Sequence, residues 1–548
     1  MTGPNTDTAT APPESRLNGR LFLIAFLAAA ALLLIGILLD QDPKNDVASC
    51  YARQVREFAG GNWDTAFFHM TPPLTVVLGG ILAKLGLPAF TALKLVSAAF
   101  FLAGLWPLRR LLRRMVPGPL AEWGCLLYAL APQLTRYAAS GLLDMAKMFF
   151  LLWLAELLTA QAVDTGSKWR RSLWIGAAFA GLALARAEGL FFLPLVLACM
   201  FIPDLVRKPA CTCGRLKPAL LGAARAGLAA GVALILCLPQ ALYERGTTGY
   251  PVLDSRQIAP VRKVLEKLSL GGRWDAMARP VQTPPGQPVI GTAKQEDRPE
   301  DTVTPWRNLK ETAKGLEPLF LALAGLGLWL RLRRREFGLP DAVCAAFILY
   351  NVLLLTGTGF ILKRYVMTTQ PFLLVWAVTG VLCVKERFLD RMHVRLFPAA
   401  AILVLVVSAG AVAPKLVHLN PPEKPFGCWL RAHRGGFITP ATQPLKSDLL
   451  DYHDGRLPLV LAAVPQYSFW AECDWVIIPG KYSCTPDELR QIARRQNAGI
   501  LVVDKQLYSL CPELKPEQTP WLEAIKDAPA NPRIAAYRII RPEQEPPP

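Results

Sequence analysis

The chain has 548 residues, of which 52% are hydrophobic and 19% are charged, and its mean hydropathy is +0.29. Soluble domains usually carry about 25% charged residues, so the composition excludes an ordinary cytosolic enzyme, a coiled coil and a disordered chain. The net charge of +18 would suggest nucleic acid in a soluble protein. Here the basic residues form short clusters between apolar segments, and no basic stretch is interleaved with aromatic side chains, so we exclude a nucleic-acid partner.

Apolar segments long enough for a helix to cross a bilayer recur from residue 21 to about residue 413. The first follows a polar tail, residues 1–20, and lacks a small-residue cleavage site, so we expect an uncleaved membrane helix. The sequence predicts an α-helical polytopic membrane domain over 21–413 with about eleven spans. These are expected near 21–39, 90–108, 120–136, 146–163, 172–186, 189–203, 219–242, 316–331, 340–360, 366–384 and 397–413.

Every second junction between these segments is basic, which predicts that these junctions are cytoplasmic. They contain Arg109–Arg114, Lys168–Arg171, Arg207–Lys217, Arg331–Arg335 and Lys385–Arg395. The amino terminus is therefore expected on the cytoplasmic side of a bacterial inner membrane. Residues 40–89, 243–315 and the segment after 413 would then face the periplasm.

One apolar segment, residues 72–87, is too short for an ordinary span, opens with two prolines and contains Lys84. Counting it as a span would turn the acidic loop before it inward. We therefore predict an interfacial or re-entrant helix within the first outer loop, residues 40–89.

The polar C-terminal segment, residues 414–548, is predicted to form an extracytoplasmic α/β domain. Thr485-Pro-Asp-Glu488 matches a helix capping box with proline in the first turn. The segments PLVLAAV, DWVIIP, ILVVD and AAYRII are typical of buried strands.

Ionisable residues at the outer membrane surface are the candidates for chemistry, because such groups are costly in lipid. Each also has a structural interpretation: a solvated loop residue or helix cap, an ion pair closing a turn, or an interfacial anchor. A carboxylate can act as a general base and arginines can bind a phosphate in a bidentate manner. The candidates are Asp46, His69, Arg136, Asp144, Lys147, Arg186, Glu188, Lys363, Arg364 and Tyr365.

These pieces and their order resemble the GT-C membrane glycosyltransferases, and among them the bacterial relatives of protein O-mannosyltransferases and of the lipid A aminoarabinose transferase. The resemblance covers about residues 20–410. It rests on Asp46 after the first span, Pro72-Pro73-Leu74, Leu85-Gly86, Asp144 before a Phe-rich span, Arg186-Ala187-Glu188-Gly189-Leu190, Thr248-Gly249-Tyr250-Pro251-Val252 and Arg364-Tyr365 followed by Pro371.

The resemblance implies that a sugar is transferred from a polyprenyl-phosphate donor, with inversion, to a glycan, lipid or protein acceptor. Asp46 would be the general base. The leaving phosphate would be held by Arg186, Lys363 and Arg364, with a hydrogen bond from Tyr365. His69, Asp144, Glu188 and Tyr250 would belong to the substrate site.

The sequence departs from this family in one respect that concerns metal binding. Aminoarabinose transferases commonly carry Glu-Lys directly before the PPL segment, and this chain has Met70-Thr71. The resemblance therefore leaves a divalent metal open. Two other functions also remain: a ligase or polymerase of envelope polymers with a similar fold, and a transporter, although no internal repeat supports the latter.

Overall fold

The structure is a computed structural model, and its described residues divide into two compact units. The helical unit comprises Met1–Leu38, Lys94–Leu242 and Glu300–Val417, and the sheet unit comprises Leu39–Leu93, Tyr243–Pro299 and His418–Pro548. The described residues are 13–44, 46–67, 73–116, 118–164, 166–206, 216–248, 252–253, 310, 312–314, 318–357, 363–384, 423–433, 459–463, 466–471, 474–477, 485–495, 498–525 and 534–540.

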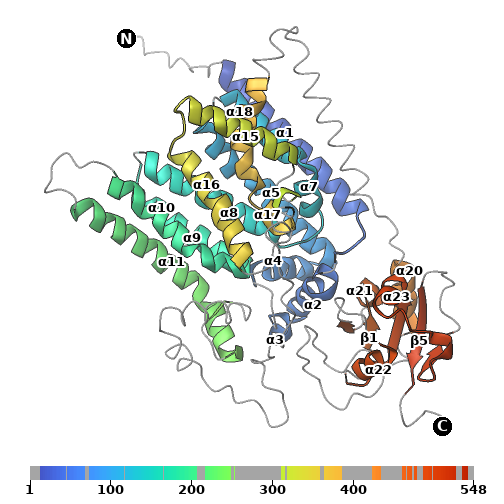
Figure 1. Ribbon diagram of the computed structural model, residues 1–548. Helices are drawn as coiled ribbons and strands as arrows, with labels where there is room; N and C mark the ends of the chain where they lie inside the picture. The colour runs from blue at the N-terminus through green and yellow to red at the C-terminus, as the bar shows by residue number, and fades with distance from the viewer. Residues whose placement is uncertain are drawn as a thin grey trace, which may run out of the picture. The chain divides into compact units, whose positions relative to one another are not determined.

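Packed helices form the helical unit, and α8 lies at its centre (Figure 1). α8 contacts α7, α9, α10 and α16, while α18 packs against α6 and α15. The helices are α1 (Pro13–Leu39), α5 (Ala89–Arg113), α6 (Gly118–Leu130), α7 (Pro132–Ala138), α8 (Asp144–Val163), α9 (Lys168–Ala185), η2 (Ala187–Phe192), α10 (Leu193–Val206), α11 (Leu216–Thr248), α15 (Pro318–Arg333), α16 (Leu339–Gly357), α17 (Lys363–Met367) and α18 (Gln370–Val384).

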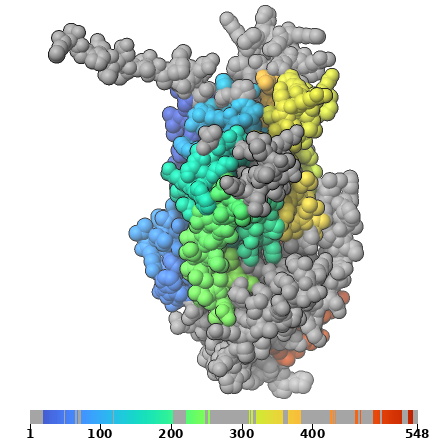
Figure 2. Space-filling view, turned by 90° about the vertical axis from the view of Figure 1, so that its left-hand side faces the viewer, coloured from blue at the N-terminus to red at the C-terminus, as the bar shows by residue number. Residues whose placement is uncertain are grey.

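The outer surface of these helices is apolar. Figure 2 shows α11 on the surface, and its exposed side chains include Leu234, Ile235 and Leu238. Large contiguous apolar surface is rare on soluble proteins, and here it fits contact with lipid. Among the described residues five helices are long and apolar enough to cross a membrane, so the chain is a membrane protein, but the predicted count of eleven is not confirmed.

Two predicted spans differ in the structure. The segment 120–136 forms two helices, α6 and α7, because Pro132 cannot donate the backbone hydrogen bond that would continue the first. Ala131 is extended, with φ −62° and ψ 115°. The segment 366–384 is likewise divided between α17 and α18. The last predicted span, 397–413, lies outside the described residues.

Three of the basic junctions meet at one end of the helical unit. Arg114 donates to Glu156 Oε1 at 2.7 Å and to Asp164 Oδ2 at 2.9 Å, and Arg171 lies 3.3 Å from the same Asp164 oxygen. Arg331 donates hydrogen bonds to the buried Asp341 and to the main-chain oxygen of Met115. The junctions 207–215 and 385–395 lie outside the described residues. The shared end agrees with the predicted alternation of basic junctions.

Short helices of the first loop form one part of the sheet unit. They are η1 (Val47–Tyr51), α2 (Ala52–Gly60), α3 (Trp63–Ala66) and α4 (Pro73–Lys84). α4 corresponds to the predicted interfacial or re-entrant segment, and its 12 residues span about 18 Å, too little for the roughly 30 Å hydrocarbon core. Phe58 and Val76 join α2 to α4 in a small apolar cluster.

A five-stranded sheet, in the order β2-β1-β3-β5-β4, forms the other part. β1, β2 and β3 are parallel, and β5 is antiparallel to β3 and β4. The predicted strands correspond to β1, β2, β3 and β5, and the predicted capping box forms, with Thr485 N donating to Glu488 Oε2 at 2.8 Å. The elements are α20 (Glu423–His433), β1 (Leu459–Ala462), α21 (Gln466–Ala471), β2 (Asp474–Ile477), α22 (Pro486–Arg495), β3 (Ile500–Asp504), α23 (Lys505–Leu510), η7 (Pro516–Gln518), β4 (Leu522–Ala524) and β5 (Ile534–Ile539).

Each face of the sheet is covered by helices. Leu489 of α22 and Leu507 of α23 pack on the face that carries Leu501, while Phe426 of α20 and Tyr467 of α21 pack on the other. β3 is buried along its whole length. The sheet and its four helices therefore enclose two apolar cores, one on each side.

Candidate functional site

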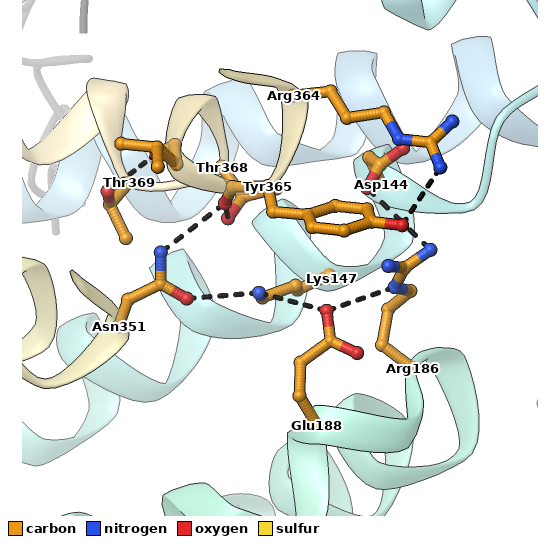
Figure 3. A network of polar contacts seen from close by, with 10 residues as sticks. Asp144, Lys147, Arg186, Glu188, Asn351, Arg364, Tyr365, Thr368 and Thr369 are labelled. Carbon is orange, nitrogen blue, oxygen red and sulfur yellow. Dashed lines mark hydrogen bonds and ion pairs between the residues drawn. The ribbon is translucent and has the colours of Figure 1, made fainter. Parts of the chain in front are cut away.

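Charged and neutral polar side chains gather at one end of the helical unit, where several elements begin or end (Figure 3). They come from the first turn of α8, the turn between α9 and η2, the later half of α16, and α17. α8 has 20 residues and is about 30 Å long. The cluster therefore lies about one membrane thickness from the basic junctions at the other end.

The turn after α9 places Arg186 and Glu188 in this cluster. α9 ends because Arg186 is extended, with φ −151° and ψ 140°. Arg186 Nε donates to Glu188 Oε1 at 3.2 Å, and Lys147 Nζ donates to the same oxygen at 3.2 Å. Lys147 also donates to Asn351 Oδ1 at 3.0 Å. The ion pair expected within the turn is thus present, and it is extended through Lys147 to α16.

Tyr365 lies between two guanidinium groups (Figure 3). The guanidinium carbon of Arg186 is 4.6 Å from the centre of the Tyr365 ring, and that of Arg364 is 4.8 Å from it. Arg364 Nη2 donates to the phenol oxygen at 2.8 Å, and Asn351 Nδ2 donates to the Tyr365 carbonyl at 3.3 Å. These cation–π and hydrogen-bond contacts fix the orientation of both arginines.

Asp144 is fully buried beside Arg186, with 3.8 Å between its Oδ1 and Arg186 Nη1. Neither carboxylate oxygen of Asp144 has a hydrogen-bond partner within the described part of the chain. Within the described residues, the cluster holds three cations, Lys147, Arg186 and Arg364, against two carboxylates, Asp144 and Glu188. One positive charge is in excess in this set, which favours an anionic ligand.

Tyr137 is a further residue near this cluster, on α7 just after the predicted span 120–136. Burial raises the pKa of the Tyr137 phenol, the Arg136 charge lowers it, and the Asp144 carboxylate raises it. A phenol whose pKa is above its ordinary value stays protonated at neutral pH and remains a hydrogen-bond donor.

Gly189 is required for the turn that carries Arg186 and Glu188. A Cβ at position 189 would lie 2.2 Å from the carbonyl oxygen of Leu182, a backbone atom that cannot move aside. We expect Gly189→Ala to destabilise the helical unit by about 1–3 kcal/mol, the cost of overpacking, and to displace both charged side chains. The matched control is Gly227→Ala on α11, where an added Cβ meets nothing within 4 Å.

The stability of the two glycine variants is measured by thermal denaturation in detergent. Gly189→Ala should lower the melting temperature, and Gly227→Ala should not. If both variants melt alike, the close approach of η2 to α9 is not needed.

Asp46 lies in the sheet unit, half-buried at the start of η1. It occupies the N-cap position, but its side chain makes no capping hydrogen bond, so its interpretation as a helix cap is not supported. Tyr51 OH approaches Asp46 Oδ2 at 3.5 Å. Two other acids lie a few residues before Asp46 and have contacts of their own: Asp40 is fully buried and accepts from Asp42 N, and Asp42 pairs with Lys44 at 2.8 Å.

The structure brings together six of the candidate residues: Asp144, Lys147, Arg186, Glu188, Arg364 and Tyr365. Lys363 begins α17, and its side chain lies outside the described part of the chain, as do His69 and Tyr250. Sequence reasoning did not single out Asn351 or Tyr137. Asn351 is a polar residue within the apolar run FILYNVLLL, which is the signal that could have identified it.

The described residues offer no obvious metal centre. No group of three or more His, Cys, Asp or Glu side chains among them could hold a metal ion. The acids of the helical cluster are each opposed by an arginine or lysine. As far as it is described, the donor set of this cluster therefore does not fit a metal.

No family model and no curated protein matches this chain in sequence. Solved structures match it in three dimensions. The oligosaccharyltransferase of Archaeoglobus fulgidus, in a complex with Zn and sulfate, superposes with a TM-score of 0.55 at 15% identity over 89% of this chain and 69% of that one. ArnT from Cupriavidus metallidurans, bound to undecaprenyl phosphate, gives 0.54 at 14% identity over 95% and 99%.

A third structure is that of AglB from Archaeoglobus fulgidus, with an inhibitory peptide and a dolichol-phosphate. Its TM-score is 0.54 at 12% identity, over 93% of this chain and 73% of that one. All three are GT-C glycosyltransferases. The chain has the GT-C fold. The GT-C fold agrees with the resemblance found in the sequence, and at these identities it establishes the architecture alone.

Proposed function

We propose that this protein is a membrane glycosyltransferase that takes a sugar from a polyprenyl-phosphate donor. The observation that carries the proposal is the cluster formed by the buried Lys147 and Arg186 and the half-buried Arg364. Its excess positive charge, within the described residues, would hold the donor phosphate. The solved neighbours that bind dolichol-phosphate or undecaprenyl phosphate support it. The active site would face the periplasm, on the side opposite the basic junctions.

In the proposed reaction an acceptor hydroxyl or amine attacks the anomeric carbon from the face opposite the phosphate. The bond between this carbon and the phosphate oxygen breaks, and polyprenyl phosphate leaves with the electron pair. Asp46 accepts the acceptor's proton, and the configuration at the anomeric carbon is inverted.

Arg186 and Arg364 have the residue type that this step needs. Charge develops on the leaving phosphate in the transition state, and cations held in place beforehand stabilise it without reorganisation. Both guanidiniums are held against the Tyr365 ring, and Arg186 is also held by Glu188. Asp144, whose oxygens have no hydrogen-bond partner within the described residues, would accept a hydrogen bond from a donor sugar hydroxyl.

The experiment that tests the function compares envelope glycans by mass spectrometry in cells with and without the protein. The loss of one sugar from a lipid, glycan or protein identifies the acceptor. Purified protein in nanodiscs is then given that acceptor and a polyprenyl-phosphate sugar, and released polyprenyl phosphate is measured. An envelope that loses a whole polymer would favour a ligase or polymerase. An unchanged envelope, with no polyprenyl phosphate released, would contradict the proposal.

A further inference from the structure

The loop that carries Asp46 is attached to the C-terminal sheet at two points. Lys424 Nζ of α20 donates to Gln41 Oε1, and Gln466 Nε2 of α21 donates to the carbonyl oxygen of Pro43 at 3.1 Å. α21 also contacts η1, the helix that Asp46 begins. All of these residues belong to the sheet unit. Segments about 380 residues or more apart in the sequence are thus joined within a few residues of Asp46.

The two attachment points are themselves fixed to the core of the sheet. Phe426 of α20 packs edge-on against Tyr467 of α21, with 5.7 Å between the ring centres. Tyr467 OH donates to Asp504 Oδ2 at 3.0 Å, and Asp504 caps α23 through Oδ1. Lys424 Nζ lies 5.3 Å from the centre of the Trp470 ring. A buried network of this kind holds α20 and α21 in one orientation.

The loop is also ordered from within. Asp42 N donates to Asp40 Oδ1 at 3.1 Å, Lys44 pairs with Asp42, and Ala48 N donates to the Lys44 carbonyl at 2.8 Å. These bonds shape the segment between α1 and η1 but join it to no other part of the fold. Among the described residues, the bonds from α20 and α21 join the loop to the sheet.

From these contacts we propose that the C-terminal sheet holds the Asp46 loop in its working position, and that Lys424 and Gln466 are positioning residues for transfer. The proposal rests on the function proposed above. A general base must stand within hydrogen-bond reach of the proton that it takes, and a displacement of about 1 Å costs up to a hundred-fold in rate. A loop that leaves the membrane directly after α1 needs an external support to meet this requirement.

The test uses the full-length protein in nanodiscs with Lys424→Met, which keeps the side-chain length but removes the ammonium group. We expect kcat to fall about ten-fold while KM for donor and acceptor stays unchanged. Lys424→Arg, which keeps a donor, should restore most of the rate. Gln466→Met should act in the same direction as Lys424→Met. The control is Lys505→Met on the exposed start of α23, which should behave like the wild type.

Hydrogen exchange of the backbone amides in residues 40–51 provides a readout that does not depend on catalysis. Exchange there should be faster in Lys424→Met, with β3 and β5 unchanged. If Lys424→Met and Gln466→Met both show wild-type kcat and wild-type hydrogen exchange, the proposal that the sheet positions the Asp46 loop is wrong. The transferase proposal would then still stand. A raised acceptor KM at unchanged kcat would also overturn the positioning proposal, because α20 and α21 would then bind acceptor. If neither the wild type nor any variant transfers sugar, the transferase proposal fails. Hydrogen exchange alone then decides whether the sheet holds the Asp46 loop.

Discussion

Asp46→Asn should slow sugar transfer at least about a hundred-fold, the contribution expected of a general base. Asparagine keeps the size of the side chain but cannot take a proton from the acceptor at neutral pH. Since Asp46 makes no capping hydrogen bond at η1, the substitution should not unfold the loop. The variant should insert into the membrane, melt at the wild-type temperature and bind polyprenyl-phosphate donor with unchanged affinity.

Asp42→Asn is the matched control, because it makes the same chemical change four residues away. Asp42 forms a half-buried pair with Lys44 at 2.8 Å, and the amide oxygen of asparagine at position 42 can still accept a hydrogen bond from Lys44 Nζ. Its transfer rate should therefore stay close to that of the wild type. Near-normal transfer by purified Asp46→Asn with its true acceptor would remove both the base and the mechanism built on it. A fall in donor affinity would instead assign Asp46 to donor binding.

Arg364→Ala should impair transfer about ten- to a hundred-fold. One charge-assisted hydrogen bond to the donor phosphate is worth about 1.5–3 kcal/mol, and each 1.36 kcal/mol changes a rate about ten-fold. Arg364 is positioned for this role by the Tyr365 ring and hydroxyl. The rate is measured as polyprenyl phosphate released by purified protein at matched expression.

Arg334→Ala removes a cation from the opposite end of the helical unit, directly after α15, and should leave the rate unchanged. Arg364→Lys separates charge from geometry, because lysine keeps the charge but cannot bind phosphate in a bidentate manner. It should show an intermediate rate. Equal activity of Arg364→Ala and Arg334→Ala would exclude Arg364 as a phosphate ligand.

Local signals determined much of what the sequence could predict. The apolar segments, the capping box at Thr485 and the buried strand 500–504 could all be predicted from the sequence, because each depends on neighbouring residues alone. The start of α8 at Asp144 was readable for the same reason. The count of spans was less secure, since Pro132 divides a segment whose composition alone fits one helix.

The sequence predicted the charged residues of the cationic cluster but not the contacts between them. The turn that carries Arg186 and Glu188, and the Arg364-Tyr365 step, stand out because charges interrupt apolar sequence. That Lys147 bridges Glu188 and Asn351, and that Tyr365 lies between two arginines, depends on how α8, α16 and α17 pack. No local pattern encodes those distances.

The sequence by itself therefore determined that this is a helical membrane protein with charged groups at one face, because hydropathy and charge are properties of short segments. Only the tertiary structure decided which charges meet. Lys147 and Asn351 are 204 residues apart, and Lys424 and Gln41 are 383 apart. Such contacts arise when packed helices and sheet faces fix side chains in space, and the sequence between the partners does not specify them.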